Sequence, residues 1–229
     1  DIYVSPTGND TTGTGSSTQP YATIQKGIDV AQPGQVIGLK PGTYSGAGNR
    51  ELNIDGKNLT LVSEQGASNT IVDFGQRRLM TINNNSTATI EGLTLQNSLY
   101  AAGSDWSIEA SLKAVDSSLT LRRCLFRNNT ATSTYGTSVM SLINVSKQNN
   151  PQASLLVEHC LFHNNQINGG RLNGAQLIRN QNLGFAEIRF STLADNVMPH
   201  GTHVWSSRQL LTGCSVRTSI IYGNTAPQN

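Results

Sequence analysis

The sequence predicts an all-β chain that coils into a right-handed parallel β-helix. A short unit of alternating apolar and polar residues around a two-residue kink occurs four times, at spacings of 36, 31 and 28 residues. Alternation with a period of two is typical of strands, and a drifting repeat is typical of a solenoid whose turns carry loops of different lengths. The abundant Asn, Gly, Ser and Thr argue against a helical repeat. The copies span 121–129, 157–165, 188–196 and 216–224, with a weaker one at 90–97.

Composition indicates one soluble domain. Hydrophobic residues make up 36% of the 229 residues and charged residues 13%, and no apolar run is long enough to span a membrane. The formal net charge is +2 and the basic residues are scattered, so we expect no nucleic-acid partner. We expect a single domain over residues 1–229, with an N-terminal strand and capping helix in 1–35 and coils in 36–229.

The first residues differ from the repeats and are typical of a cap. Residues 1–10 predict a strand that enters a Gly-rich loop, and 19–31 predict a short helix with Ile24, Ile28 and Ala31 on one face. Pro33 and Gly34 end this helix. Because the first turn of a solenoid exposes apolar side chains and a strand edge, the helix is expected to cover both. Residues 36–39 are then the first strand of the β-helix proper.

Three cysteines are expected to point inward. Cys124 and Cys160 take the same place in successive units, and Cys214 aligns with an inward position two places before the unit. Stacked turns bring equivalent Cα atoms to about 4.8 Å, within disulfide range, but parallel neighbours rarely offer the required dihedral angle. We expect free, buried thiols that act as small apolar fillers. The odd count without a C-x-x-C spacing argues against zinc, and no metal or cofactor is expected.

An asparagine column ends each unit at a bend. Asn tolerates turn conformations, and stacked amides can satisfy one another's hydrogen bonds from turn to turn. We interpret this column as a structural ladder, together with the two aligned cysteines. The ladder residues are Asn129, Asn165, Asn196, Asn224, Cys124 and Cys160.

Residues 3–10, 20–26 and 36–44 resemble the opening of bacterial secreted right-handed β-helix proteins of the pectin-lyase-like superfamily. The close, 219–226, is similar to coils of surface proteins called choice-of-anchor Q proteins. The resemblance spans nearly the whole chain and implies the fold and an extracellular or cell-surface setting. The start at Asp1, without a signal-like stretch, fits a processed secreted protein and fits a shortened sequence equally well. The superfamily mixes polysaccharide lyases and hydrolases with non-catalytic surface modules.

The acidic residues do not favour an enzyme. A lyase needs carboxylates that hold calcium, or basic side chains, together with a positioned base. The 14 acidic residues are scattered, with no adjacent Asp-Asp pair, and the Asp-Asp-Gly motif of the lyases that this N-terminus resembles is absent from the sequence. Neither a calcium cluster nor the paired acids of a glycoside hydrolase is visible, so no catalytic residue is expected.

The loops after the units are the candidate ligand-binding surface and are expected to line one edge. Exposed aromatic rings beside hydrogen-bonding groups can stack on sugar rings, although such rings can also fold back over the core. His200 and His203 do not predict a metal pair, because no third ligand is evident. The candidate residues are Tyr100, Asp105, Trp106, Tyr135, Arg171, His200, His203 and Trp205.

The last unit is expected to leave an open edge, because only a few polar residues follow it. Either the chain is a fragment of a longer solenoid, or this end docks on a surface or matrix component or stacks head-to-tail on a second copy. The hypothesis is a non-catalytic extracellular surface, matrix or filament module that adheres or self-assembles. The alternative is a lyase-like carbohydrate-active enzyme or glycan-binding domain that holds a polysaccharide at the loop edge. The self-assembly residues are Ile220, Ile221, Tyr222 and Asn224.

Overall fold

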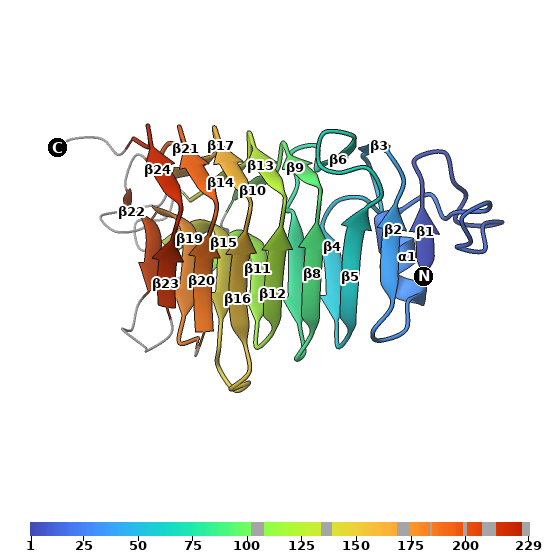
Figure 1. Cartoon of the computed structure of the whole chain (residues 1–229), viewed down its shortest axis with the longest axis horizontal. Helices are drawn as coiled ribbons and strands as arrows, with labels where there is room; N and C mark the ends of the chain where they lie inside the picture. The colour runs from blue at the N-terminus through green and yellow to red at the C-terminus, as the bar shows by residue number, and fades with distance from the viewer. Residues whose placement is uncertain are drawn as a thin grey trace.

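In the computed structural model the chain winds as a right-handed parallel β-helix (Figure 1), which confirms the predicted fold class. The front strands in Figure 1 run upward, and the chain passes over the top and returns behind them while it advances from right to left. This sense of winding is right-handed. The structure describes residues 1–101, 108–133, 139–168, 175–183, 185–198, 201–207 and 214–225, without the side chains of 108, 201–207 and 214.

Three long parallel sheets form the walls, and neighbouring strands in each come from successive turns. The front sheet contains β1 (Ile2–Val4), β2 (Val36–Leu39), β5 (Asn58–Ser63), β8 (Thr87–Glu91), β12 (Ser118–Arg122), β16 (Ser154–Glu158), β20 (Phe185–Arg189) and β23 (Cys214–Arg217). The upper sheet contains β3 (Gly42–Tyr44), β6 (Thr70–Asp73), β9 (Thr94–Gln96), β13 (Leu125–Arg127), β17 (Leu161–His163), β21 (Thr192–Ala194) and β24 (Ile220–Tyr222).

The rear sheet closes each turn. It contains β4 (Leu52–Asp55), β7 (Met80–Asn83), β11 (Ile108–Val115), β15 (Val139–Ser146), β19 (Ala175–Gln181) and β22 (Gly201–Ser207). A short additional sheet between the upper and rear sheets contains β10 (Leu99–Ala101), β14 (Thr130–Thr132) and β18 (Gln166–Asn168). The middle turns therefore hold four strands.

Single residues in the left-handed region turn the chain at two corners of each coil from β8 onward. Between the front and upper sheets these residues have φ between 44° and 68°, and after the upper sheet they have φ between 52° and 63°. They are the kinks seen in the repeated unit, because one left-handed residue reverses the side-chain alternation without needing a long loop. The first corner uses Gly92, Arg123, His159, Phe190 and Thr218, and the second uses Asn97, Asn128, Asn164, Asp195 and Gly223.

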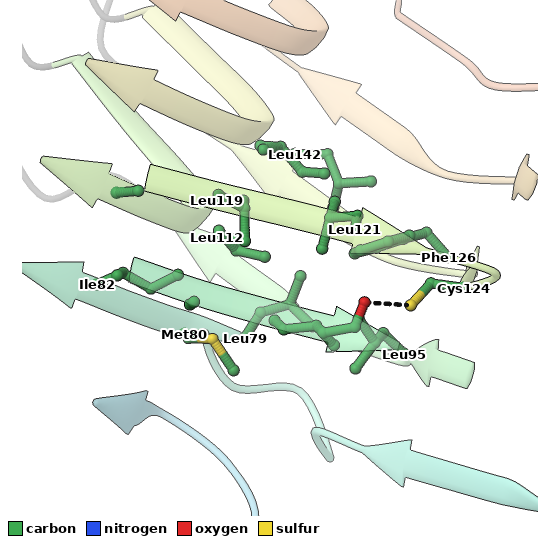
Figure 2. Packing of buried hydrophobic residues seen from close by; sticks show 14 of the residues in the cluster. Leu79, Met80, Ile82, Leu95, Leu112, Leu119, Leu121, Cys124, Phe126 and Leu142 are labelled. Atoms are coloured by element: carbon green, nitrogen blue, oxygen red, sulfur yellow. Dashed lines mark hydrogen bonds between the residues drawn. The ribbon is translucent and has the colours of Figure 1, made fainter. Parts of the chain in front are cut away.

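The core runs along the axis as columns of equivalent inward residues. Phe126 and Phe162 are fully buried, and their rings stack with centroids 4.7 Å apart and planes 7° apart. Figure 2 shows Leu112 of β11, Leu121 of β12 and Leu79, which immediately precedes β7, entering the same space from different turns. Burial of each such side chain contributes about 1.5–3 kcal/mol, so the stacked columns supply much of the stability of the solenoid.

The N-terminal end is closed by a helix and a paired loop. Helix α1 (Ile24–Val30) buries Ile24 and Ile28 against β1, β2 and β4, as the sequence predicts. The expected start at residue 19 is wrong. The Asp10 carboxylate accepts the backbone N–H groups of Ala22 and Thr23, and Tyr21 pairs with β1, so these residues are held extended. Within the described residues, no helix is long and apolar enough to cross a membrane.

Candidate functional site

The asparagine column is a continuous hydrogen-bonded ladder. The Nδ2 of Asn129 donates to Oδ1 of Asn165 at 3.0 Å, and Asn165 to Asn196 and Asn196 to Asn224 donate in the same way at 2.8 Å. The backbone N–H of each donor residue also reaches the same oxygen, and each Nδ2 donates again to a carbonyl of the preceding turn. Buried amides that are satisfied so fully have no hydrogen bond left for a ligand.

A second ladder of thiols and hydroxyls lies at the first corner. Ser191 Oγ accepts from the N–H of Cys160 at 3.1 Å, and Ser219 Oγ accepts from the N–H of Ser191 at 3.2 Å. Cys124 and Cys160 are free and buried, and both thiols donate to backbone carbonyls two residues earlier. They are therefore hydrogen-bonded members of a ladder and more than the apolar fillers expected. Burial raises the pKa of the Cys160 thiol well above its usual value.

A row of charges that the sequence reasoning missed runs along the outer face of the front sheet. Glu158 pairs with Arg122 at 3.3 Å and with Arg189 at 2.9 Å, and Glu187 lies 3.4 Å from Arg217. The paired strands place Arg122, Glu158 and Arg189 in register, and Arg217 is the partner of Arg189 in the next turn. Glu91 pairs with Arg123 one turn earlier. This row could have been predicted from the sequence, because charged residues take the same position in the aligned units. Because these pairs are partly exposed, each contributes little stability.

Tyr100 is the one loop-edge candidate whose side chain the structure describes, and it lies in strand β10 where a loop was expected. The guanidinium carbon of Arg78 lies 4.0 Å from the centroid of the Tyr100 ring, and Arg78 Nη2 lies 2.6 Å from Glu109 Oε2. Lys113 Nζ lies 3.2 Å from the other Glu109 oxygen. A hollow of about 360 Å³ opens beside them, lined by Glu51, Gln76, Arg77, Arg78, Leu99, Tyr100 and Ala101.

The chemistry of the Tyr100 hollow suits binding better than proton transfer. Burial raises the pKa of Tyr100, and the opposing effect of Arg78 does not restore it, since Glu109 raises it further. A phenol with a raised pKa stays protonated at neutral pH and is a poor general base. Arg78 also covers one face of the ring, and Glu109 offsets the charges of Arg78 and Lys113.

The other loop-edge candidates are not gathered into a described site. Asp105, Trp106, Tyr135, Arg171 and His200 lie outside the described residues. His203 and Trp205 lie in strand β22, where a loop was expected, and pair in register with Gln176 and Ile178, but their side chains lie outside the description, as does that of Cys214.

The last turn exposes side chains of the strands that end the front and upper sheets. Ile220, Ile221 and Tyr222 in β24 are 61%, 47% and 56% exposed. Ile221 pairs in register with the fully buried Leu193, so it belongs to an inward column of the core. The asparagine ladder also ends in this turn, at Asn224.

The family model described as "Protein of unknown function (DUF1565)" matches residues 6–200 of this sequence. The chain belongs to the DUF1565 family. No curated protein matches the DUF1565 chain.

Solved structures with a similar course include two lyases and an esterase. A rhamnogalacturonan lyase is 12% identical with a TM-score of 0.43, and the match covers 97% of the DUF1565 chain and 62% of the lyase. The PL6 family alginate lyase AlyGC is 16% identical with a TM-score of 0.44, covering 99% and 39%. A carrot pectin methylesterase is 12% identical with a TM-score of 0.38, covering 100% and 88%. The DUF1565 chain spans less than two thirds of either lyase, and likenesses at this level assign no activity.

Among the described residues of the DUF1565 chain, no three His, Cys, Asp or Glu side chains come together as a metal site.

Proposed function

We propose that this chain is a non-catalytic module of an extracellular surface or matrix, which adheres or assembles by pairing through its last turn. The observation that carries the proposal is the exposure of a core column at that turn. Phe162 and Leu193 are fully buried in the column, whereas Ile221, the next member, is 47% exposed. An inward apolar side chain loses its stabilising contribution when no further layer covers it.

Backbone groups at the last turn add a directional requirement. In earlier turns the N–H of each ladder asparagine donates to Oδ1 of the next asparagine. The N–H of Asn224 has no acceptor among the described residues, and β23 and β24 end their sheets without a further described neighbour. Unpaired strand edges are templates for pairing with another polypeptide.

At the opposite end of the solenoid the outer edge of β1 is already paired, which favours one way for two copies to meet. The N–H of Tyr3 donates to the carbonyl of Gly15, and Tyr21 pairs with β1 on its outer edge. Head-to-tail stacking, which the sequence suggested and which would build a filament, needs an open strand edge at this end, so we propose instead that two copies pair tail to tail. Such an interface uses the same surface twice and gives a closed dimer. The proposal also includes that the chain is secreted by a bacterium and is related to choice-of-anchor Q surface proteins.

Sedimentation velocity across a wide concentration range tests stacking. The chain is expected to form a dimer, and Ile221→Asp is expected to weaken dimerisation at least about tenfold, because a carboxylate cannot be buried unpaired in the interface. Leu161→Asp is the matched control, since Leu161 is also exposed on the upper sheet but lies two turns from the open edge. A chain that stays monomeric at every concentration contradicts self-stacking, and an equal effect of both variants contradicts the assigned surface.

A second candidate function is the binding of an acidic glycan at the Tyr100 hollow. The favouring observation is that Arg77, Arg78 and Tyr100 line one accessible hollow. A uronate carboxylate would compete with Glu109 for Arg78, as charge-assisted pairs with arginine permit. Titration with hexagalacturonate is expected to change tyrosine fluorescence, and Arg78→Gln should abolish the change. Unchanged fluorescence rejects this function, and new absorbance from an unsaturated product would instead show lyase activity.

A further inference from the structure

A second hollow, of about 560 Å³, lies where the rear strands β4, β7 and β11 end. Its lining comes from four consecutive turns, which stack at about 4.8 Å, so the lining residues are spread along the axis of the β-helix. It shares no lining residue with the Tyr100 hollow. The lining residues are Asn53, Asp55, Asn83, Asn84, Asn85, Val115, Asp116 and Asn149.

Several of these side chains are not explained by the fold. Asn84, Asn85 and Asp116 have left-handed backbones, for which Asn and Asp are suited. Asn53 and Asp55, however, occupy the exposed positions of β4, and Asn83 ends β7. Asn and Asp are depleted in strands, so these three positions hold residues that weaken the local strand. Residues that contradict local propensity are expected at functional sites.

The hollow offers both donors and acceptors. The Asn83 and Asn85 side chains make no hydrogen bond within the described part of the chain, and Asn53 Nδ2 is similarly uncommitted while its Oδ1 accepts from Thr81. Asp55 Oδ1 accepts from Asn84 Nδ2 at 2.6 Å, which leaves Oδ2 for another donor. Hydroxyl groups both donate and accept, and therefore match such a mixed lining.

Charge narrows the class of ligand. The lining carries two carboxylates and no Lys or Arg, so a uronate would meet like charge with no compensating cation. A metal cation would also find too few free ligand atoms in this hollow. Asp116 Oδ1 already accepts the N–H groups of Gln148, Asn149 and Asn150, and the described residues contain no metal-binding group of three. The ligand that fits this lining is therefore an elongated, uncharged molecule with many hydroxyl groups.

We propose that this hollow binds an uncharged oligosaccharide that lies along the axis of the β-helix. Amide groups of Asn53, Asn83 and Asn85 from two adjacent turns hydrogen-bond its hydroxyls. The lining has no aromatic ring to stack on the sugar and stays open to water, so the dissociation constant is on the order of 1 mM. The proposal concerns a different surface from the last turn and does not depend on assembly.

The test is an NMR titration of the whole chain with cellohexaose, maltohexaose and laminarihexaose, following the side-chain NH2 signals of asparagine. At least one neutral hexamer is expected to shift the signals of Asn53, Asn83 and Asn85 in a saturable way. Hexagalacturonate is expected to leave them unchanged. The proposal is overturned if no neutral hexamer shifts these signals, if hexagalacturonate shifts them equally, or if calcium chloride alone does so.

Two variants separate binding from folding. Asn53→Thr and Asn83→Thr are expected to weaken binding at least about threefold each, while the midpoint of urea unfolding stays equal or rises, because Thr favours strands more than Asn does. Gln96→Thr on β9 removes an exposed-face amide elsewhere and is expected to leave binding unchanged. A loss of stability in the two Asn variants with unaltered binding would show that these residues serve the fold alone.

Discussion

Single buried residues hold successive turns in register. Asn165 makes two hydrogen bonds through Nδ2, to Asn196 Oδ1 and to the Phe126 carbonyl, and its Oδ1 accepts two from Asn129. The left-handed residue before each ladder asparagine turns the chain so that the amide points inward. An amide ladder of this kind joins adjacent turns more specifically than apolar packing, because each turn must present an oxygen at one position.

Replacement of Asn165 by Ala is expected to destabilise the chain by about 3 kcal/mol, because it leaves several buried donors and acceptors without partners. Urea unfolding followed by far-ultraviolet circular dichroism measures the change. Gln166→Ala, at an exposed neighbouring position, is the control and should stay within about 0.5 kcal/mol of the parent chain. A similar small change in both variants would mean that the ladder does not contribute to stability.

Asp116 predicts a pH dependence. Burial would raise the pKa of this carboxyl, but backbone N–H groups of Asn150, Asn149 and Gln148 outweigh burial and lower the pKa below its usual value. A lowered pKa in the folded state stabilises the fold above the unfolded value of about 3.9, and this stabilisation is lost as the pH falls through the folded value. Asp116→Asn should therefore be less stable than the parent at neutral pH and approach it in acid. A constant difference across pH contradicts this assignment.

At the scale of elements, the corners direct the chain from a strand of one sheet to a strand of the next sheet. From β8 onward, each corner between the front and upper sheets uses one left-handed residue, yet only Gly92 of these is a glycine, and Thr218 takes this conformation with φ of 44°. A β-branched residue is strained in the left-handed region by about 1–2 kcal/mol relative to glycine. The neighbouring strands and ladders hold these residues in place despite that cost.

Thr218→Gly is therefore expected to stabilise the chain by about 0.5 kcal/mol or more, since relief of strain exceeds the added entropy of the unfolded chain. Thr192→Gly in strand β21 is the counterpart, and should destabilise by about 1 kcal/mol because its backbone is extended. Urea midpoints of the two variants give the comparison. If Thr218→Gly lowers the midpoint, the corner is not strained.

Structural elements could be predicted from the sequence where the residues that define them lie close together in one segment. The period of two, the aligned Asn column and the cap face of Ile24 and Ile28 all rest on local spacing, and all are present in the structure. The start of α1 was predicted too early, because the Asp10 carboxylate that holds Ala22 and the N-cap residue Thr23 outside the helix comes from a separate loop. The additional sheet of β10, β14 and β18 was missed because its strands are only three residues long.

The described residues form a rod in which α1 covers the first turn and the last turn exposes Ile220, Ile221 and Tyr222 (Figure 1). The contact of Arg78 with Tyr100 joins different turns, so its register depends on loop lengths that no single unit encodes. The polar hollow at the ends of the rear strands was missed for the same reason, since its residues are separated by whole turns. Ile221 could be assigned to an inward column from the sequence because the last unit repeats the pattern of the buried ones.

The most direct test of stacking at the last turn is sedimentation velocity of the parent chain beside Ile221→Asp at matched concentrations. The account predicts a concentration-dependent dimer for the parent and a monomer for the variant, with both retaining the same circular dichroism spectrum. A monomeric parent, or a dimer that survives in Ile221→Asp, would contradict the assignment of the last turn as the interface.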